Sequence, residues 1–239
     1  MRAERVDTGQ ISEFRLVGVA GDLVPGVRKC AFAEHDGYWS RSFPAGSAHV
    51  DRAWAGFERL IEPCLRQAAG LDPAPWEAAL ELVCRRLTGA GVDWWLVGSG
   101  ALAARGIAVE PGDLDLVVSG MEAHRVGELL LDGLIEPVAP VEWFCEWFGR
   151  AMLGARVEWV GGLGPASDEP EVSDFGLSAA ARLEVVRWRE WEIRVPPVAL
   201  QRATSVRREL GDRVRLIDAY TGCSGTGGGS STPTRAEPG

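Results

Sequence analysis

Residues 71–221 alternate between strand-like and helix-like stretches, and this alternation most constrains the fold that the chain can adopt. The strand-like stretches are short and rich in Val, Leu and Trp, and they are Trp94–Val97, Asp113–Val118, Arg156–Val160, Leu183–Trp188 and Trp191–Val195. The helix-like stretches are Trp76–Thr88, Ala101–Arg105, Met121–Leu131, Val141–Leu153 and Pro197–Leu210. Because the two types follow each other without a long gap, the sequence predicts an α/β or α+β sheet domain.

The rest of the chain divides into two further units. Residues 1–70 read as a small α+β extension with a strand at 14–20, a hairpin at 28–43 that turns at Asp36-Gly37, and an amphipathic helix at 50–69. Residues 222–239 are rich in Gly, Ser, Thr and Pro and have almost nothing to bury, so we expect a disordered tail. The predicted domains are therefore 1–70, 71–221 and 222–239.

The charge balance limits the kinds of molecule that the protein is expected to bind. The chain has 34 acidic and 25 basic residues, a formal net charge of −9, which argues against a protein that coats nucleic acid through a basic face. Residues 71–160 alone hold 14 acids and 6 bases. The five cysteines form no CxxC pair, and we recognise neither a signal peptide nor a membrane-spanning run. These features lead us to expect a reduced cytoplasmic protein.

Two acids lie within one of the predicted strands. Side chains alternate between the faces of a strand, so Asp113 and Asp115 point the same way while Leu114 and Leu116 point into the core. Two neighbouring carboxylates repel each other unless a cation compensates them, and a hard divalent ion is the simplest candidate. The alternative for Asp113 is an ordinary turn acid after Pro111-Gly112. Asp115 is harder to explain in that way, because an acid within an apolar strand contradicts strand propensity.

A small-residue turn precedes this strand in the chain. Gly98 and Ser99 follow the apolar Trp94–Val97 stretch and open a short helix. Small residues at such a turn allow backbone N–H groups to approach a phosphate. A phosphate-binding turn beside a metal-binding carboxylate pair is the minimal equipment for phosphoryl or nucleotidyl transfer.

The order Gly98-Ser99, then a spacer, then Asp113-x-Asp115 resembles the core motif of the DNA polymerase β-like nucleotidyltransferase superfamily, over roughly residues 76–220. The resemblance implies a mixed sheet with flanking helices and a third carboxylate from a later strand. Glu158, between apolar Val157 and Trp159, matches that position, and its alternative is an exposed residue on an edge strand. Three other acids compete for the role: Glu142 and Glu146, four residues apart on an expected helix, and Glu192 on an alternating strand.

The same resemblance implies a mechanism and its ligands. Two Mg²⁺ ions would be held by Asp113, Asp115 and Glu158, with Glu158 also helping to deprotonate an acceptor hydroxyl while pyrophosphate leaves an NTP. Gly98 and Ser99 would bind phosphates, and Arg207, Arg208 or Arg213 could reach the triphosphate, although solvated helix charges explain any one of these arginines equally well.

The identity of the acceptor and the activity itself stay open at this point. Net acidity favours a small molecule or a protein over an RNA end as acceptor, and a homodimer is an open alternative for the assembly. A second class of function is a nonenzymatic or toxin–antitoxin binding module on the same fold, and a third is a metal-dependent phosphohydrolase. The retained set of three acids argues against the second class, and the Gly-Ser turn argues against the third.

Overall fold

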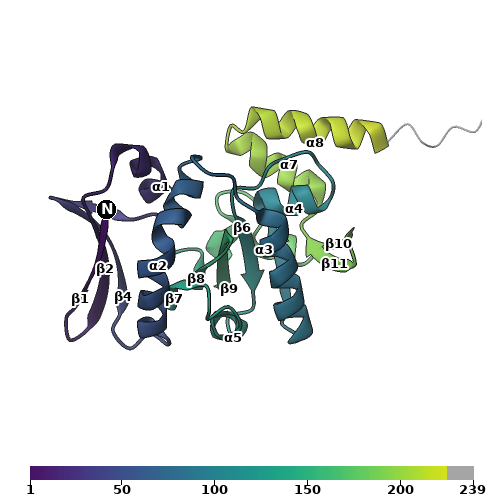
Figure 1. Cartoon of the computed structure of the whole chain (residues 1–239). Helices are drawn as coiled ribbons and strands as arrows, with labels where there is room; N and C mark the ends of the chain where they lie inside the picture. The colour runs from purple at the N-terminus through teal and green to yellow at the C-terminus, as the bar shows by residue number, and fades with distance from the viewer. Residues whose placement is uncertain (225–239) are drawn as a thin grey trace, which may run out of the picture.

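The computed structural model describes residues 1–224, which form three β-sheets with helices packed on and between them (Figure 1). The predicted disordered tail lies outside the described residues from position 225 onward. Its predicted start is three residues early, because helix α8 (Gly211–Ser224) includes residues 222–224.

The central sheet has five strands in the order β5-β6-β9-β8-β7. These are β5 (Trp94–Val97), β6 (Leu114–Val118), β9 (Ala155–Leu163), β8 (Cys145–Leu153) and β7 (Leu134–Pro140). Strands β6 and β9 run parallel, whereas the other three neighbouring pairs are antiparallel. The sheet is therefore mixed, and the predicted α+β class with flanking helices is confirmed.

The N-terminal sheet is antiparallel, with the order β1-β2-β4-β3. Its strands are β1 (Arg2–Asp7), β2 (Ile11–Val17), β4 (Tyr38–Pro44) and β3 (Ala33–His35). The predicted turn at Asp36-Gly37 joins β3 to β4, and Gly37 has the positive φ that such a turn needs. The strand expected from residue 28 is wrong at its start, because α1 (Val24–Lys29) includes residues 28 and 29 and β3 begins only at Ala33. Pro25 lies in the first turn of that helix, where its missing N–H costs no hydrogen bond.

The helices cover the central sheet and separate it from the N-terminal one (Figure 1). They are α2 (Val50–Ala68), α3 (Trp76–Val83), which continues as a π-helical turn (Cys84–Thr88), α4 (Gly98–Ala104), α5 (Glu122–Leu129), α6 (Leu177–Ala180) and α7 (Val198–Arg207). Helix α2 packs between the two sheets, against β7 on one side and the N-terminal core on the other. The two strands predicted over residues 183–195 are β10 (Glu184–Trp188) and β11 (Trp191–Val195), which form a two-stranded ribbon beside β5. No helix of residues 1–224 combines the length and the apolar character that a membrane crossing requires.

The helix predicted over Val141–Leu153 is wrong, and the correction changes the site. Residues 145–153 form β8, which pairs with β9 across a hairpin turn at Gly154, where φ is +85°. Strand β8 is buried on both faces along much of its length, so its sequence is apolar without alternation. A continuous apolar run of this length is compatible with a helix or a buried strand.

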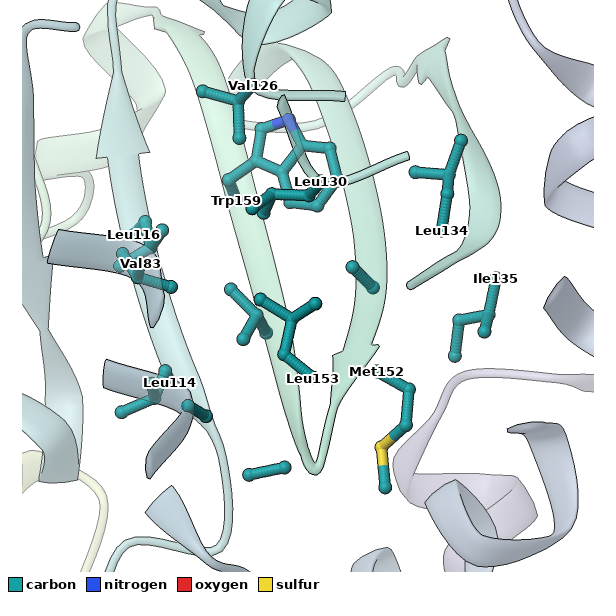
Figure 2. Packing of buried hydrophobic residues seen from close by; sticks show 14 of the residues in the cluster. Val83, Leu114, Leu116, Val126, Leu130, Leu134, Ile135, Met152, Leu153 and Trp159 are labelled. Carbon is teal, nitrogen blue, oxygen red and sulfur yellow. The ribbon is translucent and has the colours of Figure 1, made fainter. Parts of the chain in front are cut away.

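One hydrophobic cluster connects the two large sheets. It includes Phe14 and Phe57 from the N-terminal part and Leu116 and Trp159 from the central sheet, all of them at most 1% exposed. Figure 2 shows the central part, where Trp159 of β9 lies near Val126 and Leu130. The Trp159 indole N–H donates to the Ala123 carbonyl at 3.0 Å, so this buried polar atom is satisfied. The predicted boundary near residue 70 therefore lies beside a core that both parts share.

Candidate active site

Strands β6 and β9 bring the predicted acids together. The two strands are parallel neighbours, and their register places Asp115 opposite Glu158. Asp113 immediately precedes β6, and a single buried guanidinium, that of Arg156, contacts both Asp113 and Glu158. The acids from two strands thus form one cluster at the end of the sheet where α4 begins.

Gly98 allows α4 to start directly against this cluster. Its φ is +63°, a conformation that favours glycine, and a Cβ at this position would lie 3.0 Å from Asp115 Oδ2. Ser99 follows as a buried residue in the first turn. The small residues of the Gly-Ser turn therefore let the backbone and the Asp115 carboxylate approach each other closely.

Two buried arginines, which the sequence reasoning missed, hold the acids in place. Arg150 of β8 donates to Glu158 Oε1 at 2.7 Å, to the Cys30 carbonyl at 3.2 Å and to Glu136. Arg156 of β9 lies 3.3 Å from Glu158 Oε1 and contacts Asp113. Both arginines are 3% exposed. They are charged residues within apolar strand sequences, the same signal that identified Asp115.

The arginines divide the three acids into two electrostatic groups. Burial opposes ionisation of Glu158, but Arg150 and Arg156 outweigh it and hold the pKa of Glu158 below its usual value. The Asp115 carboxylate makes no ion pair or hydrogen bond with any residue in the described part of the chain. Burial, together with repulsion from Asp113 and Glu158, raises the pKa of Asp115 well above its ordinary value. Ionisation of Asp115 is therefore disfavoured unless a cation binds beside its carboxylate.

Two cavities meet at this acid. The larger, of about 640 Å³, is lined by several charged residues, and its lining includes Gly98, Ser99, Asp113 and Asp115. The smaller, of about 290 Å³, is mostly apolar and has an aromatic wall; its lining includes Asp115, Glu158, Asp174 and the rings of Trp143, Phe144, Phe148 and Phe175. Gly98, Asp115 and Arg208 line both cavities. We call them the polar cavity and the aromatic cavity.

The structure separates the three arginines that the sequence singled out. Arg208 and Arg213 line the polar cavity together with Lys29, the only lysine of the chain. None of these three cations has an ion-pair or hydrogen-bond partner among residues 1–224. Arg207, in contrast, lines neither cavity and is held by Glu171 at 3.2 Å and by the Val172 carbonyl at 2.7 Å.

The three competing acids lie outside both cavities. Glu142 is exposed in the loop before β8, and Glu146, which lies on that strand rather than on a helix, is exposed beside Gly162. Glu192 is exposed on β11. Of the four acids considered for the third position, only Glu158 is placed beside Asp115.

The carboxylates of the cluster suit one divalent cation whose remaining coordination positions are filled by a bound ligand. In the described part of the chain, no three His, Cys, Asp or Glu side chains form a ready-made metal site. Asp113 and Asp115 nevertheless line one cavity, and neither Asp113 Oδ1 nor the Asp115 carboxylate has a hydrogen-bond partner among residues 1–224. Mg²⁺ is commonly bound by one or two carboxylates together with substrate phosphates. These two residues fit that pattern, whereas one oxygen of Glu158 is occupied by arginines.

Comparison with known proteins gives structural likenesses only. No protein-family model and no curated protein matches the chain. A candidate nucleotidyltransferase from Thermotoga maritima is 17% identical with a TM-score of 0.46, over 62% of this chain and 92% of that one. The lincosamide antibiotic adenylyltransferase LnuA, solved with lincomycin, is 10% identical with a TM-score of 0.46, over 62% and 99%. The antibiotic-resistance factor ANT(2'')-Ia is 12% identical with a TM-score of 0.41, over 63% and 87%. Nucleotidyltransferases thus recur among the structures to which this chain is similar.

Proposed function

We propose that the protein is a Mg²⁺-dependent nucleotidyltransferase, which transfers a nucleotide from an NTP to a hydroxyl acceptor. The observation that carries the proposal is the polar cavity. Its lining includes the carboxylates of Asp113 and Asp115 and the guanidinium groups of Arg208 and Arg213, which form no ion pair among residues 1–224. A ligand that satisfies both groups must bring negative charge to the arginines and a cation to the acids. An NTP with bound Mg²⁺ has this composition.

The cations that line the polar cavity suit an anionic ligand. A planar guanidinium binds two phosphate oxygens at once, so Arg208 and Arg213 suit a triphosphate better than a single ion. Burial, followed by repulsion from Arg208, lowers the pKa of Arg213. A bound anion would relieve that repulsion, and Gly98 and Ser99 would let the phosphates approach the backbone next to Asp115.

The acids have distinct roles in this proposal. Asp113 and Asp115 would hold Mg²⁺, which when bound neutralises phosphate charge and polarises the α-phosphorus. Glu158 would offer its second oxygen to a second ion. Because Arg150 and Arg156 keep Glu158 ionised and weakly basic, we do not assign it the acceptor's proton.

The proposal is tested by incubating the purified protein with Mg²⁺, each of the four α-labelled NTPs and candidate hydroxyl acceptors. Asp113→Asn combined with Asp115→Asn should abolish the transfer of label, whereas Glu192→Gln, an acid on the exposed β11 ribbon, should leave it unchanged. Transfer that survives in the double variant would overturn the proposal.

A second candidate function is a nonenzymatic nucleotide-binding module, in the class that includes toxin–antitoxin partners. The observation that favours it is the pairing of Asp113 and Glu158 with buried arginines, which leaves fewer free carboxylate oxygens for metal. Binding of all four NTPs without transfer to any acceptor, and without release of pyrophosphate, would support this candidate.

A further inference from the structure

The aromatic cavity has a composition different from that of the polar cavity, although the two share Asp115. Phe144 packs against Trp143 with ring centroids 4.0 Å apart and against Phe175 at 4.8 Å. Trp143 is 69% exposed, an unusual position for a large aromatic side chain in a free protein. The ring of Trp143 therefore lies at the edge of an apolar cavity with one of its sides open to solvent.

The in-line geometry of the proposed reaction indicates which ligand this cavity receives. Nucleotidyl transfer is an in-line displacement, so the attacking hydroxyl and the leaving pyrophosphate lie on opposite sides of the α-phosphorus. The cations that would hold the pyrophosphate line the polar cavity. The acceptor must then approach the metal-bearing Asp115 from the other side, and the aromatic cavity is the one that opens there.

We propose that the aromatic cavity is the acceptor site, and that it takes a small hydroxyl compound with a flat aromatic body and no negative charge. This inference rests on the proposed function. The volume of the aromatic cavity, about 290 Å³, lies at the lower end of the range of small-molecule sites, about 300–1,000 Å³. A cavity of this size suits a compound of one or two rings better than a nucleic-acid end or a protein surface.

The polar end of the cavity sets the charge of the acceptor. Three carboxylates, those of Asp115, Glu158 and Asp174, face one guanidinium that lines this cavity, that of Arg208. Arg150 and Arg156 offset Glu158, but Asp115 and Asp174 have no ion-pair partner in the part of the chain that the structure describes. An anionic acceptor would add to the repulsion among these carboxylates, whereas a hydroxyl can donate a hydrogen bond to one of them.

Asp174 is the carboxylate that we assign to the acceptor hydroxyl. It is 6% exposed, its backbone N–H donates to Thr204 Oγ1 at 3.1 Å, and it lines the aromatic cavity. Burial raises the pKa of Asp174, which makes it a better proton acceptor than an ordinary aspartate. In the transfer step the hydroxyl oxygen forms a bond to the α-phosphorus and its proton passes to Asp174. The bond from that phosphorus to the bridging oxygen breaks, and pyrophosphate leaves with the electron pair.

The experiment uses the full chain and measures binding rather than turnover. The probes are 2-naphthol, its anionic analogue 2-naphthoate and the aliphatic polyol myo-inositol, each titrated by saturation-transfer NMR. We expect 2-naphthol to bind more tightly than the other two. Trp143→Ala and Phe175→Ala should each weaken the binding of 2-naphthol by about tenfold or more, because each removes an aromatic contact with the ring of the probe. Val185→Ala, which removes an exposed apolar side chain of β10, should have no effect. Because Trp143 is mostly exposed, its variant should remain folded.

Parallel titrations separate this inference from the proposed function. ATP and inorganic tripolyphosphate, each with Mg²⁺, should bind the wild type and Trp143→Ala with unchanged affinity. If Trp143→Ala weakens the binding of ATP but not that of tripolyphosphate, the aromatic cavity holds the nucleobase and the inference is wrong. Equal binding of 2-naphthol and myo-inositol, or of 2-naphthol to wild type and variants, would also overturn it while leaving the nucleotide site intact. Failure of both ATP and tripolyphosphate to bind would instead overturn the proposed function.

Discussion

At the scale of single residues, the site is explained by which charges have partners and which do not. Asp113 and Glu158 contact buried arginines, whereas Asp115 on one side and Lys29, Arg208 and Arg213 on the other have no ion pair among residues 1–224. Unpaired charges of both signs around one cavity are costly unless a ligand compensates them. This distribution is the physical reason for assigning a metal-bound polyphosphate to the cavity.

The arginines allow a test with an adjacent control. Arg208→Ala combined with Arg213→Ala should lower the affinity for Mg²⁺–tripolyphosphate by about tenfold or more, because each lost hydrogen bond to a charged group is worth about 1.5–3 kcal/mol. Arg207→Ala, one position away but paired with Glu171, should leave the affinity unchanged. Equal losses in both variants, measured by calorimetric titration, would show that the effect is a general change in surface charge.

Cys30 predicts a dependence of stability on pH. A hydrogen bond from Cys64 and the nearby charges of Arg150 and Arg156 lower its pKa to about 6 although burial opposes this, and Arg156 Nη1 lies 3.1 Å from its Sγ. An unfolded thiol has a pKa of about 8.5. The thiolate therefore contributes stability that is fully present above about pH 8.5 and is lost as the pH falls through about 6.

Urea unfolding of wild type and Cys30→Ala measures this contribution. The difference in the free energy of unfolding should grow as the pH rises from 6 toward 8.5. Cys145→Ala is the control: burial raises the pKa of that thiol to about 11, above its unfolded value, so its difference should not grow as the pH rises toward 8.5. A difference for Cys30→Ala that stays constant with pH would contradict the assignment of a lowered pKa.

At the scale of elements, the sequence patterns were reliable where the period was clear and failed where burial removed it. The strand Trp94–Val97, the turn at Gly98 and the Asp113–Val118 region lie where they were predicted, because an acid in an apolar strand and a Gly-Ser turn are local signals. Strand β8 was mistaken for a helix because a doubly buried strand has no alternation. That error hid Arg150, whose role depends on its position opposite Glu158 across the β8–β9 pair. Pairings such as Arg156 with Asp113 join residues far apart in the chain, which no local pattern contains.

The β8–β9 pair depends on close packing at one glycine. A Cβ at Gly149 would overlap the indole ring of Trp159, which is fully buried. Gly149→Ala should therefore lower the free energy of unfolding by about 1–3 kcal/mol, the usual cost of overpacking a core. Gly21→Ala, at a position with nothing within 4 Å of an added Cβ, should change it by less than about 0.5 kcal/mol. Thermal unfolding that is equal for both variants would contradict this packing account.

At the scale of the whole molecule, the N-terminal residues form part of the structure that supports the site. Arg41 of β4 donates to Glu136 of β7 at 2.9 Å, and the Cys30 carbonyl accepts from Arg150. Helix α2 lies so close to β7 that Gly56 would clash with the Leu134 carbonyl if it carried a Cβ. The arginines beside the acids are thus held partly by residues 1–70, which the motif resemblance does not include.

A truncated chain tests this dependence. Residues 71–239 without the N-terminal part should lack cooperative unfolding and bind the apolar dye ANS, because α2 would no longer cover the apolar surface of β7. The full chain, measured in parallel by circular dichroism, should unfold in one transition. A truncated chain that unfolds cooperatively would show that residues 71–221 form an independent domain.

The central claim is that Asp113 and Asp115 bind an NTP through Mg²⁺ in the polar cavity. Calorimetric titration of ATP, with and without Mg²⁺, tests it most directly in the wild type, in Asp113→Asn combined with Asp115→Asn, and in Glu192→Gln. The account predicts binding that requires Mg²⁺ in the wild type and in Glu192→Gln, and no Mg²⁺-dependent binding in the double variant. Binding of ATP that is equally tight without Mg²⁺, or that survives unchanged in the double variant, would contradict it.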